Sequence, residues 1–283
     1  MAQSFNIACL QTRPMPDISA AIAEALPLAE AAVSGGALFL FLPEYCGGLA
    51  SDGPALVPPA ETEQDHAFLR AFREFAKSNS VWVMIGSIAV TGPDGKILNR
   101  GFVLDDQGDV QSRYDKIHMF DIQLSETEVF RESANVIPGN ESACINTPFG
   151  CIGHTICYDL RFPYLYRSLA QAGADILAVP AAFMKETGKA HWHVLNRARA
   201  IENGSFVIAP CAIGEIPGGG ISYGHSLVVN PWGEVIADGG DKPGVVMASI
   251  DLEQVTSARA RIPSLVHDRP FKQIQKNQKL RIS

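Results

Sequence analysis

Short apolar runs alternate with longer amphipathic segments along most of this sequence. Residues 37–42 are continuously apolar, which is typical of a strand with both faces buried. Between residues 61 and 78 the apolar side chains recur at helical spacing, which predicts an amphipathic helix. The same criteria predict further strands at residues 5–10, 81–90, 97–104, 110–114, 151–156, 176–180, 206–210, 227–230 and 234–237.

Capping and turn residues predict where several helices begin and end. Asp17 can cap a helix that runs to about residue 33, although Pro27 should kink or divide that helix. Pro163 suits the first turn of a helix that ends near Gly173, and residues 190–203 form a further helical segment. Because helices and strands interleave throughout, the sequence predicts an α/β fold, with residues 1–283 forming a single domain.

Composition and charge exclude several classes of function. The net charge of −7 argues against a broad nucleic-acid surface, and no apolar run is long enough to span a membrane. The first residues do not resemble a signal peptide. None of the six cysteines forms a C-x-x-C pair, and a chain of this size needs no disulfides for stability. We therefore expect reduced thiols in a cytoplasmic protein.

Three residues whose side chains could take part in catalysis follow predicted strands. Glu44, Lys116 and Cys157 each come just after a strand, where α/β folds commonly place functional groups. Taken singly, each has a structural explanation: a surface carboxylate, a solvated lysine and a packed cysteine. Taken together, they supply a nucleophilic thiol, a carboxylate base of raised pKa, and an ammonium group that can stabilise an oxyanion.

Five sequence blocks resemble the nitrilase superfamily of carbon–nitrogen hydrolases. In the family's order they are LPEY at 42–45, YDKIHMFD at 114–121, ICYDLRFPYLYRSLAQAGADIL at 156–177, AHWHVLNRARAIEN at 190–203 and SYGHSLVVNPWGEV at 222–235. The resemblance implies a four-layer αββα sandwich and a Glu-Lys-Cys triad at Glu44, Lys116 and Cys157. It also implies a supporting Glu132, for which a plain loop charge is the alternative. A homodimer or larger even oligomer, packed through the helices beside the nucleophile, is implied as well.

Two of these blocks most resemble the branch that contains omega-amidase and deaminated glutathione amidase. The resemblance implies that Arg161 holds a substrate carboxylate and that Phe183 and Thr187 line the pocket. A structural salt bridge from Arg161 to Asp159 or a neighbouring carboxylate is the alternative. Residues 122–128 lack the family's frequent Pro-Gly, and three glycines at 218–220 are unusual near the expected pocket rim, so the substrate's far end stays open.

We therefore expect a thiol-dependent amidase that needs no metal or organic cofactor. Its substrate would be a small carboxylate-bearing amide of the deaminated glutathione or 2-oxo acid omega-amide type. A thioester would form at Cys157, with the backbone N–H of Tyr158 as an oxyanion donor.

Three alternatives remain open. The first is an N-carbamoyl amino acid or amine hydrolase, or a nitrilase, on the same fold. The second is a metal-dependent hydrolase that uses His191 and His193. Residues two apart on a helix face different ways, and no third ligand is evident in the sequence, so we expect no metal site. The third is a non-catalytic homologue, against which the complete triad argues.

Overall fold

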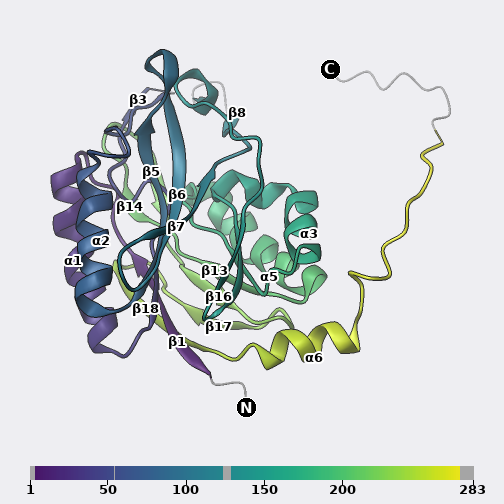
Figure 1. Ribbon diagram of the computed structural model, residues 1–283. Helices are drawn as coiled ribbons and strands as arrows, with labels where there is room; N and C mark the ends of the chain where they lie inside the picture. The colour runs from purple at the N-terminus through teal and green to yellow at the C-terminus, as the bar shows by residue number, and fades with distance from the viewer. Residues whose placement is uncertain (1–3, 54, 124–128, 275–283) are drawn as a thin grey trace.

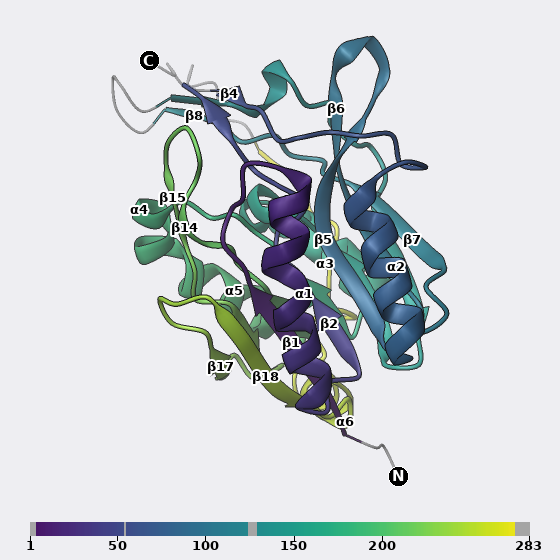
Figure 2. The ribbon, with the colours of Figure 1, turned by 90° about the vertical axis from the view of Figure 1, so that its left-hand side faces the viewer.

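The protein is built from two six-stranded sheets packed face to face, with helices on both outer surfaces. The computed structural model describes residues 4–53, 55–123 and 129–274 (Figure 1). Helices α1 (Ile18–Ser34) and α2 (Ala67–Asn79) cover one sheet, and α3 (Pro163–Gln171) and α5 (His193–Asn203) cover the other (Figures 1 and 2). This arrangement confirms the expected αββα sandwich.

The first sheet pairs the first strand of the described residues with the last. Its strand order is β18-β1-β2-β5-β6-β7. β1, β2 and β5 are parallel neighbours, and the remaining pairs are antiparallel. The strands are β1 (Phe5–Gln11), β2 (Phe39–Phe41), β5 (Trp82–Thr91), β6 (Ile97–Leu104), β7 (Val110–Asp115) and β18 (Gly244–Ile250).

The second sheet follows the same plan, with three central parallel strands and antiparallel edges. Its order is β10-β11-β12-β13-β16-β17, in which β11, β12 and β13 are parallel. The strands are β10 (Cys144–Thr147), β11 (Gly150–His154), β12 (Ile176–Ala178), β13 (Phe206–Ala209), β16 (Leu227–Val229) and β17 (Val235–Asp238).

Short elements complete the chain. Three two-stranded ribbons pair β3 (Ser51–Asp52) with β4 (Ala55–Leu56), β8 (Asp121–Gln123) with β9 (Val129–Arg131), and β14 (Ile213–Glu215) with β15 (Ile221–Tyr223). The remaining helical pieces are η1 (Pro93–Gly95), η2 (Glu132–Ala134), η3 (Cys157–Arg161), α4 (Lys185–Thr187), η4 (Gly188–Trp192) and α6 (Glu253–Arg261). Within the described residues, no helix combines the length and apolar character needed to cross a bilayer.

Alternation along the strands produces three apolar layers. In β1, Ile7 and Cys9 face the other sheet, whereas Ala8 and Leu10 face α1 and α2, because successive side chains of a strand point to opposite faces. Phe206 and Ile208 of β13 complete the layer between the sheets. The continuously apolar runs of the sequence therefore mark strands that are buried on both faces.

Two helices differ from the sequence expectation. α1 runs through Pro27 as one helix, capped as expected by the Asp17 side chain, which accepts a hydrogen bond from Ala20 N. Its alanine face is buried on both sides of Pro27, so packing against the sheet keeps the helix continuous despite the lost backbone hydrogen bond. α2 begins at residue 67 rather than 61, because the Glu61 carboxylate accepts from Ala67 N at 2.7 Å and so caps the helix from outside it.

The C-terminal part of the first sheet was not expected from the sequence. β18 pairs along the whole of β1, from Phe5 opposite Ile250 to Gln11 opposite Gly244. α6 follows it directly, and only Val255 and Ala258 of this helix are buried. The helical periodicity of α6 is weak in the sequence, since most of its side chains are polar.

His154 lies at the end of β11, and its burial gives the fold a measurable acid sensitivity. Burial lowers the pKa of His154 from its ordinary value of 6.5 to about 4. The unfolded chain therefore binds a proton below pH 6.5, whereas the folded chain does so only below about 4. As far as His154 is concerned, the free energy of unfolding is highest above pH 6.5 and falls as the pH drops towards 4. About 2 kcal/mol is lost between pH 7 and pH 5.

We expect His154→Leu to remove this part of the pH dependence. Urea unfolding at pH 7 and pH 5 should show a smaller loss of stability in the variant than in the wild type, by about 2 kcal/mol. His267→Gln, at an exposed histidine, is the matched control and should behave like the wild type. Equal losses in His154→Leu and the wild type would contradict the assignment.

Candidate active site

The expected triad residues converge from both sheets. Glu44 follows β2 and Lys116 follows β7, both in the first sheet, whereas Cys157 opens η3 after β11 of the second. All three side chains line one pocket. The structure thus brings together three residues that lie between 41 and 113 positions apart in the sequence.

Lys116 lies between two buried carboxylates. Its Nζ donates to Glu44 Oε1 at 2.8 Å and to Glu132 Oε2 at 2.8 Å. The Lys116 side chain is only 1% exposed, so these are hydrogen bonds between fully desolvated charges. Glu44 Oε2 also accepts from Ala182 N at 3.0 Å, and Glu132 Oε2 from Phe120 N at 2.7 Å. Every charged group of the cluster is therefore held in a fixed position.

Asn99 and Tyr45 complete this cluster and were missed by the sequence analysis. Asn99 Nδ2 donates to Glu44 Oε1 at 3.0 Å and to Glu132 Oε1 at 3.1 Å. The Tyr45 hydroxyl donates to Glu132 Oε1 at 3.2 Å. Asn99 did carry a signal, because a polar residue in the middle of a predicted strand needs a buried partner.

Cys157 occupies a backbone conformation that is rare for a residue with a side chain. Its φ is 49°, in the left-handed region, and its amide donates to Pro180 O at 2.8 Å. Such strain is concentrated at functional sites, where the surrounding structure enforces it. The next amide, of Tyr158, lies in the first turn of η3, where backbone N–H groups have no partner within the helix. This N–H can therefore serve a ligand beside the sulfur.

Gly86 allows the two halves of the site to approach each other. A Cβ at this position would lie 2.1 Å from Leu42 O, 2.4 Å from Pro43 O and 2.4 Å from the Cβ of Pro180. The segment that carries Glu44 and the segment that holds the Cys157 amide consequently both pack against the backbone of β5 at Gly86. A larger residue would push these segments apart.

The charges of the cluster set a resting protonation state that differs from the expected one. Burial and the neighbouring Glu44 raise the pKa of the Cys157 thiol well above its ordinary value. Burial alone would raise the pKa of Glu44, but Lys116 and a hydrogen bond with Cys157 lower it overall. The expectation of a carboxylate with a raised pKa is therefore wrong. The site therefore rests as a neutral thiol beside an ionised carboxylate.

The pKa of Lys116 follows the same electrostatic logic. Burial would lower it, yet the charges of Glu132 and Glu44 raise the pKa well above its usual range. Lys116 therefore stays an ammonium throughout the accessible pH range and provides a permanent positive charge beside the sulfur. An ammonium has three N–H donors, and one of them serves a further acceptor when the two Glu132 oxygens, at 2.8 and 3.1 Å, share a single N–H.

His118 acts on the site through Asp159. The fully buried Asp159 carboxylate accepts from the Tyr114 hydroxyl at 2.7 Å and from Ile156 N at 2.8 Å, and it lies 2.7 Å from His118 Nδ1. The His118 ring stacks on Phe162 at 3.5 Å between centroids. These contacts fix both ends of η3 and so the position of the nucleophile.

The pocket beside the sulfur is mainly apolar. Phe183 and Thr187 line it, as the sequence analysis expected, and Gly219 lies at its edge. The glycine run at 218–220 therefore does reach the pocket. Residues 124–128, which carry most of the other departure from the family pattern, lie outside the described residues. The remaining lining residues are Tyr45, Leu49, Leu56, Phe120, Phe130, Tyr158, Ala182, Met184 and Ile216.

Arg161 lies beside the pocket with its guanidinium against two of the pocket's aromatic rings. The guanidinium carbon is 5.4 Å from the Phe183 ring centroid and 5.8 Å from that of Tyr158. Its nitrogens donate to His191 Nδ1 at 3.3 and 3.4 Å. Asp159 is occupied by other donors, and the part of the chain that the structure describes places no carboxylate in a salt bridge with Arg161. The structural alternative for Arg161 is therefore not observed.

Comparison with known proteins identifies close relatives of this chain. Residues 6–260 match the family described as carbon-nitrogen hydrolase. A deaminated glutathione amidase of Synechocystis sp. is 37% identical over 271 residues, which cover 93% of this chain and 97% of that protein.

Two solved structures share the fold. The NitFhit protein of C. elegans superposes with a TM-score of 0.86 at 32% identity, over 95% of this chain and 66% of that one. The Nit3 protein of Saccharomyces cerevisiae, a member of branch 10 of the nitrilase superfamily, gives a TM-score of 0.81 at 27% identity. That match covers 92% of this chain and 95% of the yeast chain.

Proposed function

Because this chain belongs to the carbon–nitrogen hydrolase family, we propose that it hydrolyses the amide of a small, carboxylate-bearing metabolite through a thioester at Cys157. Hydrolysis of C–N amide bonds is the reaction class of the family and of its amidase relatives. The observation that carries the proposal for this chain is the convergence of a thiol, a carboxylate and an ammonium at one pocket.

In the first half of the reaction, Cys157 Sγ attacks the amide carbon while its proton passes to Glu44. The resting pKa values oppose a free thiolate, so proton transfer and attack proceed together. The oxyanion receives hydrogen bonds from Lys116 Nζ and the Tyr158 N–H. Glu44 then gives its proton to the leaving nitrogen, the C–N bond breaks, and ammonia or an amine departs from a thioester.

In the second half, water replaces the departed amine. Glu44 accepts a proton from this water as its oxygen attacks the thioester carbon, and the same donors hold the second oxyanion. The C–S bond breaks, the sulfur regains its proton from Glu44, and the carboxylic acid leaves. Glu132 does not exchange protons in this scheme. It positions Lys116 through hydrogen bonds at 2.8 and 3.1 Å, and so is a positioning residue.

Arg161 gives the proposed substrate its second recognition point. Its guanidinium faces the aromatic wall of the pocket and has no carboxylate partner among the described residues. A guanidinium forms two parallel hydrogen bonds with a carboxylate. The aromatic rings beside Arg161 do not accept these hydrogen bonds, so the N–H groups stay available for a substrate carboxylate. A substrate carboxylate at a distance from the scissile amide fits this position. The relatives named deaminated glutathione amidase agree with such a substrate.

We expect Arg161→Gln to raise KM for carboxylate-bearing amides roughly 10- to 100-fold, with a smaller change in kcat. The loss corresponds to one charge-assisted hydrogen-bonding pair of about 1.5–3 kcal/mol. Steady-state kinetics on two matched amides, one with and one without the distal carboxylate, measure it. The amide without the carboxylate is the internal control and should be hydrolysed equally well by both proteins. An equal loss on both amides would assign Arg161 a structural role instead.

A substrate panel tests the proposed function directly. Release of ammonia or amine is measured for deaminated glutathione, 2-oxo acid omega-amides, N-carbamoyl amino acids, carbamoyl amines and nitriles, each at the same concentration. The proposal expects the highest kcat/KM with a carboxylate-bearing amide. Preferred turnover of a carbamoyl compound or a nitrile would show that the proposed substrate class is wrong. The assignments of the fold and of the nucleophile would stand. No turnover of any compound would support the non-catalytic alternative.

The alternative of a metal hydrolase built on His191 and His193 finds no support in the geometry. His191 lies against Arg161, whereas the His193 ring faces Asp238. The two imidazoles therefore serve different neighbours. Neither histidine is among the residues that line the pocket beside Cys157.

We propose that the protein works as a homodimer or larger even oligomer packed through α3 and α5. These helices lie side by side on the outer face of the second sheet (Figure 1). They present exposed apolar side chains, of which Tyr164 is 84%, Val194 66% and Ile201 53% exposed. Light scattering should give at least twice the chain mass of 30.5 kDa, and Tyr164→Asp should shift the population to monomer. A monomeric wild type would overturn this proposal.

We also propose a cytoplasmic location. The six free cysteines support it, because disulfides are rare in the reducing cytosol.

A further inference from the structure

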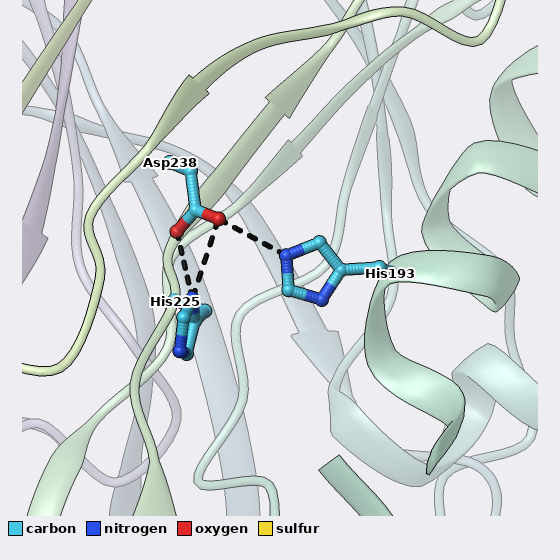
Figure 3. Close-up of side chains that lie close together, drawn as sticks. All are labelled: His193, His225 and Asp238. Carbon is cyan, nitrogen blue, oxygen red and sulfur yellow. Dashed lines mark hydrogen bonds and ion pairs between the residues drawn. The ribbon is translucent and has the colours of Figure 1, made fainter. Parts of the chain in front are cut away.

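Two histidines and an aspartate from different elements meet outside the pocket. His193 is the first residue of α5, His225 lies between β15 and β16, and Asp238 ends β17. Asp238 Oδ2 is 3.0 Å from His193 Nε2, and Asp238 Oδ1 is 2.9 Å from His225 Nδ1. Figure 3 shows both rings turned towards the carboxylate. We call these three residues the His-His-Asp cluster.

We propose that the His-His-Asp cluster is a binding site for a divalent transition-metal ion of the zinc type. One ligand atom from each of the three residues lies within 4.8 Å of the other two. Zinc ligands stand about 2.0–2.2 Å from the ion, so neighbouring ligand atoms of a tetrahedral site are roughly 3.3 Å apart. The two nitrogen–oxygen distances in the cluster already approach this value. Small shifts of the two rings would complete the site.

The backbone around the cluster is held by hydrogen bonds that do not use the ligand atoms of the rings. His225 N donates to Gly240 O at 2.8 Å, and His225 O accepts from Trp192 Nε1 at 2.7 Å. Gly240 N donates to Asp238 Oδ1 at 2.9 Å. His225 also has a φ of 52°, which only a well-fixed surrounding maintains. Such supporting contacts orient metal ligands and restrict their motion.

Aromatic packing restricts the two rings further. The His225 ring stacks on Tyr223 at 4.6 Å between centroids, and the His193 ring meets the Tyr223 ring edge-on at 6.3 Å. Both imidazoles therefore have a defined orientation before any ion binds. A prearranged set of ligands loses little conformational entropy on binding.

The type of ion follows from the donor atoms and the local charge. Two imidazoles and one carboxylate favour zinc, nickel, cobalt or copper over magnesium and calcium, which prefer oxygen ligands. Lys185 and Lys189 line the cavity beside His225, together with Asp241. The positive charges of the two lysines repel a cation that is held by charge alone, so binding depends on direct coordination by the three ligands. The three ligand side chains are 34%, 27% and 36% exposed, so an ion and a completing water can reach them.

The expected effect of the ion is on stability. It would tie the start of α5 to β17 and to the β15–β16 connection, which are three separate segments of the chain. None of the three ligands lines the pocket that contains Cys157. The sequence alone predicts no metal site, because His193 pairs there with His191 and no third ligand is evident. The ligands His225 and Asp238 become neighbours of His193 only through the packing of the second sheet.

The experiment measures metal uptake by the full chain after removal of metal with a chelator. Cys157→Ala and Cys144→Ser are introduced as a common background, so that reactive or exposed thiols do not bind the ion. Zinc content after equilibration and desalting should be one ion per chain. Zinc at about 100 times its dissociation constant should raise Tm by roughly 5 °C, whereas magnesium should leave Tm unchanged. Cobalt(II) should add the visible absorption bands of a tetrahedral site.

Variants at the ligands separate a real site from surface binding. His193→Gln and Asp238→Asn should abolish zinc uptake, the Tm rise and the cobalt bands. His267→Gln, at an exposed histidine outside the cluster, should retain all three. Circular dichroism and Tm without metal show that each variant is folded, and a misfolded variant is replaced by His225→Gln. Equal zinc uptake by the wild type and the folded ligand variants, or no uptake by the wild type, would overturn the proposal.

Discussion

Cys157→Ala should lower kcat/KM for the best amide substrate by about 10⁴-fold or more, because the thioester can no longer form. No second thiol can take over the reaction. Cys46 and Cys211 are buried, and burial raises the pKa of Cys211 to about 12. Neither residue lines the pocket. Ammonia or amine release under identical conditions measures the loss.

A matched cysteine variant controls for this result. Cys144→Ser removes an exposed thiol on β10 that is not among the residues lining the pocket, and should leave kcat/KM unchanged. Unfolding of Cys157→Ala in urea should show a stability close to that of the wild type, since one small buried atom is lost. Turnover by Cys157→Ala above one hundredth of the wild-type rate would rule out the covalent scheme.

Lys116→Met should be the second most damaging substitution, with kcat lowered about 10²–10³-fold. Removing one oxyanion donor in a comparable site has this effect. The substitution also leaves Glu44 and Glu132 facing each other in a dry interior without their shared cation. Removal of one partner from a buried ion pair lowers stability by about 3–5 kcal/mol, so the variant should unfold at lower urea concentration. Kinetics and urea unfolding are measured on the same preparation.

Two further variants separate catalysis from stability at this position. Lys116→Met combined with Glu132→Gln removes one uncompensated charge, and should recover part of the stability but none of the activity. Lys77→Met changes an exposed lysine of α2 and should affect neither quantity. If the double variant regained activity along with stability, Lys116 would act only as a structural counter-ion.

The sequence predicts much of the fold and the triad because both depend on local patterns. The continuous apolar runs correctly mark strands buried on both faces, such as β2 and β12. Glu44, Lys116 and Cys157 stand out because each directly follows such a strand or its neighbour, at the edge where functional groups gather. Their convergence follows from topology, which the interleaved elements and the family resemblance together indicate.

The rest of the site depends on contacts that local patterns do not reveal. Gly86 matters only because two prolines from distant segments, Pro43 and Pro180, come within 2.4 Å of the point that a Cβ would occupy. The lowered pKa of Glu44 follows from the distances of Lys116 and Cys157, which outweigh the burial that the sequence could suggest. The boundary of α2 was misplaced because its cap, Glu61, lies outside the helix. The His-His-Asp cluster was missed because its ligands come from three separate elements.

Intact-protein mass spectrometry after rapid acid quench tests the central claim most directly. The protein is mixed with a slowly hydrolysed carboxylate-bearing amide and stopped during the first turnover. We predict a covalent adduct with the mass of the substrate minus ammonia or amine, located by peptide mapping on Cys157 and absent from Cys157→Ala. Release of one equivalent of ammonia or amine without any adduct, or with an adduct on another residue, would contradict the thioester mechanism.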